Sequence, residues 1–165
     1  MKKYSVVILV IASDDKDFYI NFIENYWKKI INYIKEKNYS IKVFLLFSNK
    51  PTNIILNDED IIISNTVDGY TPGILMKTIY AFDYVNKNIE YKHILRTNLS
   101  SFFLIEKILN ISKNLNYTNI YAGILGITGK NNYCQFISGS GFWLSKDNVD
   151  FILKNKNNLN YDIID

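Results

Sequence analysis

The sequence contains a single cysteine, Cys134, and a single histidine, His93, in 165 residues. One cysteine cannot form an intrachain disulfide, so a reducing compartment, the cytoplasm, is the simpler interpretation. The same counts exclude zinc sites built from cysteine and histidine. Disulfide-stabilised and cysteine–histidine zinc domains are therefore set aside.

Long hydrophobic runs and clustered charge are also missing. The apolar run from Val6 to Ala12 is ended by Ser13-Asp14-Asp15, too early for a signal peptide, and no segment is long enough to span a bilayer. The net charge is +3 and the lysines are scattered along the chain, which gives nucleic-acid binding no electrostatic support. We therefore expect neither a membrane span nor a nucleic-acid partner.

The composition is that of a folded domain, with 48% hydrophobic and 15% aromatic residues. These fractions allow a buried core, and the length suits one domain over residues 1–165. Continuous apolar runs rich in β-branched residues predict strands buried on both faces, at Tyr4 to Ile11, Ile41 to Phe47, Asp60 to Ser64 and His93 to Thr97.

Stretches with helical periodicity alternate with these strands. Helices are predicted from Lys16 to Lys35, across Ile74 to Val85, and from Phe103 to Leu115. In the second of these, Thr71 suits the N-cap and Pro72 the first helical position. The alternation predicts an α/β fold with a mixed, mostly parallel sheet flanked by helices.

The end of the chain follows a different pattern. Residues 119–127 and 134–144 predict two strands joined by a short Gly-Lys-Asn-Asn turn, which favours an antiparallel addition to the sheet. Ser145 is the predicted cap of a last helix that runs to about Lys154.

The most informative stretch is the fourth predicted strand, which ends in the polar run Arg96-Thr97-Asn98-Leu99-Ser100-Ser101. Ligands of open α/β sheets bind at the carboxyl ends of the strands. A helix that begins near Ser101 or Phe102 would add its free N–H groups and the positive end of its dipole. His93 lies inside the strand, and we expect it to be packed rather than catalytic.

Two further patterns accompany this run. One is the loop and helix Asp68-Gly-Tyr-Thr-Pro-Gly-Ile-Leu-Met-Lys77, and the other is Ser138-Gly-Ser-Gly-Phe-Trp-Leu-Ser-Lys-Asp147. Together with Leu95-Arg-Thr-Asn-Leu-Ser100, in this order, they make the chain resemble the GT-A (Rossmann-like) nucleotide-sugar glycosyltransferases, most of all the Fringe-like and β1,3-galactosyltransferase families. The polar run then occupies the place of the D-x-D motif.

The resemblance implies transfer of a sugar from a nucleotide-diphosphate donor, a UDP-sugar, to a hydroxyl of a glycan or protein acceptor, with inversion. The residues it places toward the nucleotide and diphosphate are Ser13, Asp14, Asp68, Lys77, Arg96, Asn98 and Ser100. Those it places at the sugar are Gly139, Ser140 and Gly141. Asp165 is the implied base for the acceptor hydroxyl.

The charges and glycines in these patterns have physical uses of their own. Arg96 and Lys77 supply the positive charge that a diphosphate leaving group requires, and glycines let a backbone approach a ligand closely. Simpler interpretations stay open: Ser100 and Ser101 cap a helix, Arg96 pairs with a carboxylate, and the glycines mark a bulge.

The chain departs from the family pattern where the D-x-D aspartates would stand. Those positions carry Asn98, Leu99 and Ser100, which offer no carboxylate, so we expect weak Mn²⁺ binding or none and assign no metal ligand. The alternative is a non-catalytic glycosyltransferase-like module that binds a nucleotide or glycan. A methyltransferase is disfavoured because Ser13-Asp14-Asp15 replaces a glycine-rich turn after the first strand.

The implied base also lies at an unusual place, the last residue. Asp165 corresponds to the first member of an acidic pair that follows a helix in the resembling families. This correspondence predicts either a truncated form of such an enzyme or a minimal version without the acceptor-side segment. Asp162 is interpreted as part of a solvated tail.

Overall fold

The computed structural model describes residues 3–128 and 134–161. Its strands are β1 (Lys3–Ile11), β2 (Ile41–Phe47), β3 (Ile61–Ile63), β4 (Glu90–Asn98), β5 (Tyr121–Thr128) and β6 (Cys134–Ser145). Its helices of more than one turn are α1 (Asp17–Phe22), η1 (Ile23–Trp27), α2 (Lys28–Glu36), α3 (Gly73–Asn88), α4 (Ile105–Asn114) and α5 (Lys146–Lys154).

The six strands form one mixed sheet in the order β3-β2-β1-β4-β6-β5. The strands β3, β2, β1 and β4 are parallel to one another. Strand β6 is antiparallel to β4, and β5 is antiparallel to β6. This confirms the α/β class, the mixed sheet flanked by helices, and the antiparallel pair toward the end of the chain.

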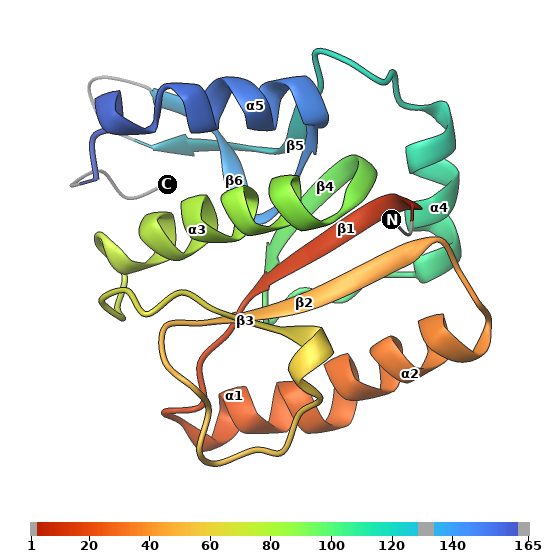
Figure 1. Cartoon of the computed structure of the whole chain (residues 1–165), viewed down its shortest axis with the longest axis vertical. Helices are drawn as coiled ribbons and strands as arrows, with labels where there is room; N and C mark the ends of the chain where they lie inside the picture. The colour runs from red at the N-terminus through yellow and green to blue at the C-terminus, as the bar shows by residue number, and fades with distance from the viewer. Residues whose placement is uncertain (1–2, 129–133, 162–165) are drawn as a thin grey trace.

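Helices cover both faces of the sheet (Figure 1). The helices α1, η1, α2 and α4 supply the core of one face, and α3 and α5 supply that of the other. Alternate residues of β1 belong to the two cores: Val6, Ile8 and Val10 face the first, while Val7 and Leu9 face the second. Burial on both faces explains why the strand is a continuous β-branched run.

The first helical segment departs from a regular helix at η1, a π-helical turn. A π turn changes which side chains share a face, and such turns are frequent at functional sites. Here the neighbours Tyr26 and Trp27 both reach the segment after β4. Trp27 donates from Nε1 to the Leu99 carbonyl at 2.9 Å, and the Tyr26 hydroxyl contacts the Phe103 backbone.

This contact accounts for a wrong prediction, the start of α4. The helix begins at Ile105, not near Ser101 or Phe102. The Phe103 N–H donates to the Tyr26 hydroxyl, which donates in turn to the Phe103 carbonyl, so the segment is held out of the helix. The N-terminus of α4 therefore lies away from the polar run, contrary to the prediction.

The start of α3 also differs from the prediction. The peptide bond between Thr71 and Pro72 is cis, Pro72 occupies the N-cap position, and the helix begins at Gly73. A Cβ at Gly73 would lie 2.7 Å from the Val67 carbonyl oxygen. The loop that carries Asp68 can therefore fold back onto the helix start only because this residue is glycine.

His93 is packed, as predicted. Its ring is fully buried, with Nδ1 3.0 Å from the Ser112 hydroxyl and Nε2 2.7 Å from the Asn116 carbonyl oxygen. Burial lowers its pKa, against the opposing effect of the bond to Asn116. The side chain therefore serves as a neutral link between β4 and the end of α4.

Over the two described ranges, 3–128 and 134–161, no helix combines the length and the apolar character needed to cross a membrane.

Candidate functional site

The strand order creates a topological switch point between β1 and β4. The chain leaves β1 for helices on one face of the sheet and enters β4 from α3 on the other face. A cleft of about 360 Å³ opens at the carboxyl ends of these two strands, where open α/β sheets bind ligands. We call it the switch-point cleft; its lining residues are Ile11, Ala12, Ser13, Asp15, Lys16, Tyr19, Asp68, Gly69, Tyr70, Ile74, Lys77, Asn98, Leu99 and Ser100.

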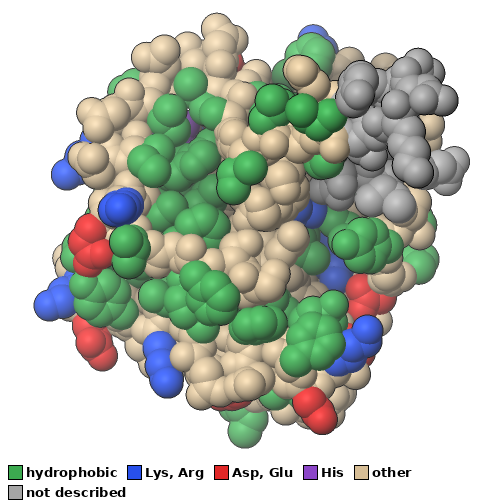
Figure 2. Space-filling model, turned by 180° about the vertical axis from the view of Figure 1, so that it is seen from behind, with side chains coloured by type: hydrophobic (Ala, Val, Ile, Leu, Met, Phe, Trp, Pro, Cys, Tyr) green, Lys and Arg blue, Asp and Glu red, His purple; other side chains and the backbone are tan. Residues whose placement is uncertain are grey.

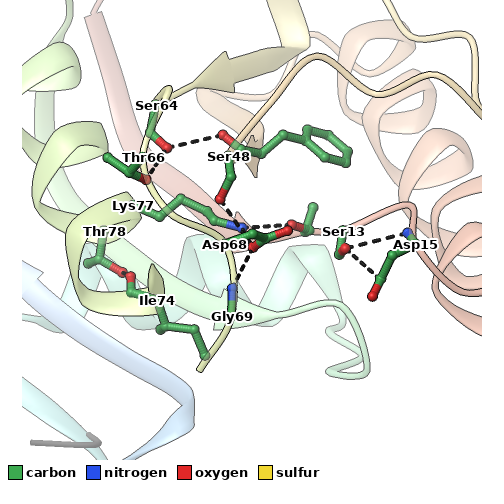
Figure 3. Close-up of polar contacts among 12 residues, drawn as sticks. Ser13, Asp15, Ser48, Ser64, Thr66, Asp68, Gly69, Ile74, Lys77 and Thr78 are labelled. Atoms are coloured by element: carbon green, nitrogen blue, oxygen red, sulfur yellow. Dashed lines mark hydrogen bonds and ion pairs between the residues drawn. The ribbon is translucent and has the colours of Figure 1, made fainter. Parts of the chain in front are cut away.

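An ion pair between Lys77 and Asp68 forms one wall of the cleft (Figure 3). Lys77 is 2% exposed, and its Nζ lies 3.1 Å from Asp68 Oδ1 and 3.1 Å from the Ala12 carbonyl oxygen. Asp68 Oδ1 also accepts bonds from the Ser48 hydroxyl at 3.1 Å and the Gly69 N–H at 3.0 Å. The ion pair thus joins the end of β1, the end of β2 and the loop before α3.

The charge on Asp68 is stabilised by these contacts. Burial by itself raises the pKa of this carboxyl, but the hydrogen bond and charge of Lys77, the Gly69 N–H and the Ser48 hydroxyl together lower it below its ordinary value. Asp68 is therefore ionised at neutral pH. Its side chain is about half exposed to solvent, so it can accept a hydrogen bond from a ligand hydroxyl.

The polar residues of the loop after β1 make two different sets of contacts. The Ser13 hydroxyl donates to Asp15 Oδ1 at 2.6 Å, and both residues line the cleft. Asp14 turns away from it and accepts bonds from the backbone N–H groups of Thr52 and Asn53 at 2.8 and 3.0 Å. Of the two residues in this loop that the resemblance placed toward the nucleotide, Ser13 lines the cleft, whereas Asp14 does not and instead holds the loop to residues 52 and 53.

Asn98 and Ser100 line the opposite wall, as the polar run at the end of β4 suggested. Arg96 lies behind them and is 1% exposed. Its Nη1 donates to the Gly139 carbonyl at 3.0 Å and approaches Asn98 Oδ1 at 3.4 Å, while its guanidinium lies 5.5 Å from the centre of the Phe142 ring. Arg96 thus reaches the cleft through Asn98.

The three residues predicted at the sugar lie on β6, next to the end of β4. Gly141 pairs with Thr97 in the sheet. The Ser140 carbonyl accepts bonds from the hydroxyls of Thr97 and Ser101 at 2.6 and 2.7 Å. Gly139, Ser140 and Gly141 are therefore brought to the same edge of the sheet as Asn98, outside the cleft lining. Asp165 lies outside the described residues.

The cleft is also lined by four polar side chains that the sequence analysis did not assign to a site: Asp15, Lys16, Tyr19 and Tyr70. The sequence offered a signal for Tyr70, which belongs to the same loop pattern as Asp68. In the structure this side chain is 73% exposed. Lys16 and Tyr19 lie at the start of the first helical segment, where they looked like ordinary surface and amphipathic positions.

In the part of the chain that the structure describes, the fold brings together no carboxylate cluster that could coordinate a metal. In residues 3–128 and 134–161, no group of three or more histidine, cysteine, aspartate or glutamate side chains could hold an ion. At the D-x-D position, the Asn98 oxygen lies 3.4 Å from the cationic Arg96, which would repel a divalent cation bound there. The neutral donors Asn98 and Ser100 fit such an ion poorly.

A second large cavity lies elsewhere in the fold. This α3–α5 groove, of about 410 Å³, lies between α3, α5 and the β5–β6 pair. Its lining is mostly apolar: Leu75, Thr78, Ile79, Phe82, Tyr121, Ile137, Phe142, Leu144, Asn148, Phe151, Ile152 and Leu159.

Comparisons with known proteins do not identify the chain. No protein-family model matches the sequence, and no curated protein sequence matches it significantly. What the chain does must therefore be inferred from the geometry of the cleft.

Proposed function

We propose that this protein is a glycosyltransferase of the GT-A type that binds a nucleotide-diphosphate sugar, a UDP-sugar, in the switch-point cleft. The observation that supports this most directly is the composition of the cleft. One wall carries the ionised Asp68 held by the buried Lys77, and the other carries the amide and hydroxyl of Asn98 and Ser100. A nucleotide has a matching division into a hydroxyl-bearing nucleoside and an anionic diphosphate.

The nucleoside then lies toward β1 and the loop before α3. Asp68, Ser13 and the exposed ring of Tyr70 all line that side. An ionised carboxylate accepts hydrogen bonds from ribose hydroxyls, and an aromatic ring can stack on a base. In this arrangement Lys77 fixes the carboxylate, so its role is to position Asp68.

The diphosphate lies toward the end of β4. The Asn98 amide and the Ser100 hydroxyl donate to its oxygens, and Arg96, in contact with Asn98, supplies positive charge from behind. Such charge stabilises the diphosphate as a leaving group when the sugar is transferred. Lys16 at the rim of the cleft is a further cation. No step in this scheme passes through a metal ion, since the donor set suits one poorly.

The base that deprotonates the acceptor is assigned to Asp165 on the family resemblance alone. Asp68 suits this role poorly, because its lowered pKa makes it a weak base. A second candidate function, a module that binds the nucleotide sugar without transferring it, is favoured by the neutral side chains of Asn98 and Ser100 in place of the D-x-D carboxylates. The two functions differ in turnover and share the binding site.

Calorimetric titration with UDP tests the binding site. Replacing Tyr70 with alanine should weaken UDP binding about tenfold, about 1.4 kcal/mol, because a stacked base loses its ring. Tyr117→Ala is the matched control, since Tyr117 is equally exposed at 73% but does not line the cleft. UDP binding that is absent, or equally affected by both substitutions, would contradict the proposal.

Release of free nucleotide from a panel of nucleotide sugars separates the two functions. A transferase releases nucleotide by transfer or slow hydrolysis of at least one donor. Binding of UDP without release from any donor would establish the non-catalytic module instead.

A further inference from the structure

A row of aromatic rings extends from the switch-point cleft across the surface of the first helical segment. Phe18 lies 4.1 Å from Tyr19 and 6.5 Å from Phe22 between ring centres. Phe102 lies 5.9 Å from Phe22 and 4.6 Å from Tyr26. We call these five residues the aromatic platform. Phe18 and Phe102 are 51% and 61% exposed, and the Lys16 Nζ lies 5.8 Å from the centre of the Phe18 ring, so part of each ring is accessible to a ligand.

The aromatic platform adjoins the cleft through Tyr19. Tyr19 lines the cleft and contacts Phe18. Ser100 lines the cleft two residues before Phe102. From behind, hydrophobic side chains form a band across the lower part of the molecule, at the height of α1 and α2 in Figure 1 (Figure 2). A ligand on the aromatic platform would therefore lie beside whatever occupies the cleft.

The aromatic platform is also held in place from below. Trp27 donates to the Leu99 carbonyl, and the Tyr26 hydroxyl bonds to both backbone groups of Phe103. These bonds fix the backbone on both sides of Phe102. A surface ordered before binding loses less conformational entropy when a ligand arrives, which is a property expected of a binding site.

Amides accompany the rings along the same helical segment. Asn21 and Asn25 are exposed, lie four residues apart, and hydrogen-bond to each other through their side chains. Residues three apart share a face of an α-helix, so Asn21 lies next to Phe18 on α1, and its bond to Asn25 brings the second amide to the same surface. The surface therefore alternates aromatic faces with groups that both donate and accept hydrogen bonds.

From these observations we infer that the aromatic platform binds a sugar ring of the acceptor glycan beside the nucleotide sugar. A pyranose has C–H groups on its faces, which pack on the negative face of an aromatic ring, and hydroxyls around its rim, which bond to amides. A purely apolar partner would leave the two amides without ligand contacts. This inference rests on the proposed function for its assignment of the ligand as acceptor.

The experiment applies the labelled full-length protein to an array of immobilised oligosaccharides in the presence of UDP. The wild type should retain at least one class of glycan. The double variant Phe18→Ala/Phe102→Ala should bind that class at least tenfold more weakly. Phe151→Ala is the matched control, because Phe151 is 67% exposed on α5, away from the aromatic platform, and it should bind as the wild type does.

A second double variant, Phe18→Leu/Phe102→Leu, keeps an apolar surface without the rings. Weak glycan binding by this variant, with unchanged circular dichroism, would show that ring stacking rather than general hydrophobicity holds the sugar. Glycan binding that is absent in the wild type, or unchanged in both double variants, would overturn the inference.

UDP affinity, measured by calorimetry on the same variants, separates this inference from the proposed function. It should stay within twofold of the wild type in both double variants. Failure of UDP to bind, with glycan binding that still depends on Phe18 and Phe102, would reject the proposed function and leave a glycan site.

Discussion

The switch-point cleft and the α3–α5 groove are similar in size, at about 360 and 410 Å³, but they differ in chemistry. The cleft lies where two parallel strands end and is lined by an ion pair, hydroxyls and an amide. The groove lies against side chains of two helices and the antiparallel strands and is lined mostly by apolar groups. Because the two cavities are similar in size, we base the choice of the candidate site on the polar side chains that the cleft collects at the strand ends.

The two regions also depend on different interactions. The cleft holds its shape through bonds between chain segments far apart in sequence, such as Lys77 to the Ala12 carbonyl. The wall of the groove is an extension of the hydrophobic core, to which Ile79, Phe82 and Leu144 belong. Substitutions should therefore have larger and more specific effects in the cleft than at the rim of the groove.

The largest effect is expected for Lys77→Ala. This substitution removes a buried aliphatic chain, leaves the Ala12 carbonyl without its donor, and frees Asp68 from its partner. We expect a loss of about 2–4 kcal/mol in the free energy of unfolding, measured by urea denaturation. Lys77→Met keeps most of the chain and should lose clearly less. Equal losses in both variants would mean that the hydrogen bonds dominate and the packing does not matter.

A smaller effect is expected for Asp68→Asn, which leaves the Lys77 cation without its carboxylate. At pH 7 we expect a loss of about 1–2 kcal/mol. The pKa of Asp68 is lower in the folded state than its ordinary value. Its contribution to stability is therefore complete above about pH 4 and is lost as the pH falls through the lower folded pKa.

Urea denaturation of the wild type and of Asp68→Asn at several pH values measures this dependence. The difference in unfolding free energy between the two proteins should narrow below about pH 4. A difference that stays constant down to pH 2 would show that the charge of Asp68 does not stabilise the fold.

The sequence predicted the strands well, since burial on both faces leaves a direct signal in runs such as Tyr4 to Ile11. It also indicated Asn98 and Ser100 at the cleft, because ligands of α/β sheets bind where buried strands end in polar residues. Asp68 was indicated by the family resemblance of its loop, whereas the other predictions needed only local patterns and the general geometry of α/β sheets.

What the sequence did not predict depends on contacts between distant segments. The start of α4 is set by Tyr26, 77 residues before Phe103, and Arg96 is directed by the Gly139 carbonyl, 43 residues away. The π turn at η1, which contains Tyr26 and Trp27, has no local signature in the sequence. No periodicity or capping pattern contains such information.

His93 provides a test that lies outside both cavities, inside β4. Its folded pKa is lower than its ordinary value of about 6.5, with burial as the main cause. Its contribution to stability is therefore complete above about pH 6.5 and is lost as the pH falls through the lower folded pKa. Thermal unfolding of the wild type should lose more stability between pH 7.5 and pH 5 than that of His93→Gln. Since the chain has one histidine, parallel pH profiles would contradict this assignment.

The smallest effect is expected at the rim of the α3–α5 groove, for Phe151→Ala. Phe151 is 67% exposed and lines the groove without belonging to the buried core. Its removal should change the free energy of unfolding by less than about 0.5 kcal/mol, and UDP affinity should stay within twofold of the wild type. A large loss of UDP binding, measured by calorimetry, would break the distinction between the two cavities, because it would place the nucleotide in the apolar groove. Unchanged UDP binding in Phe151→Ala, together with a tenfold loss of UDP affinity in Tyr70→Ala, would locate the nucleotide at the strand ends.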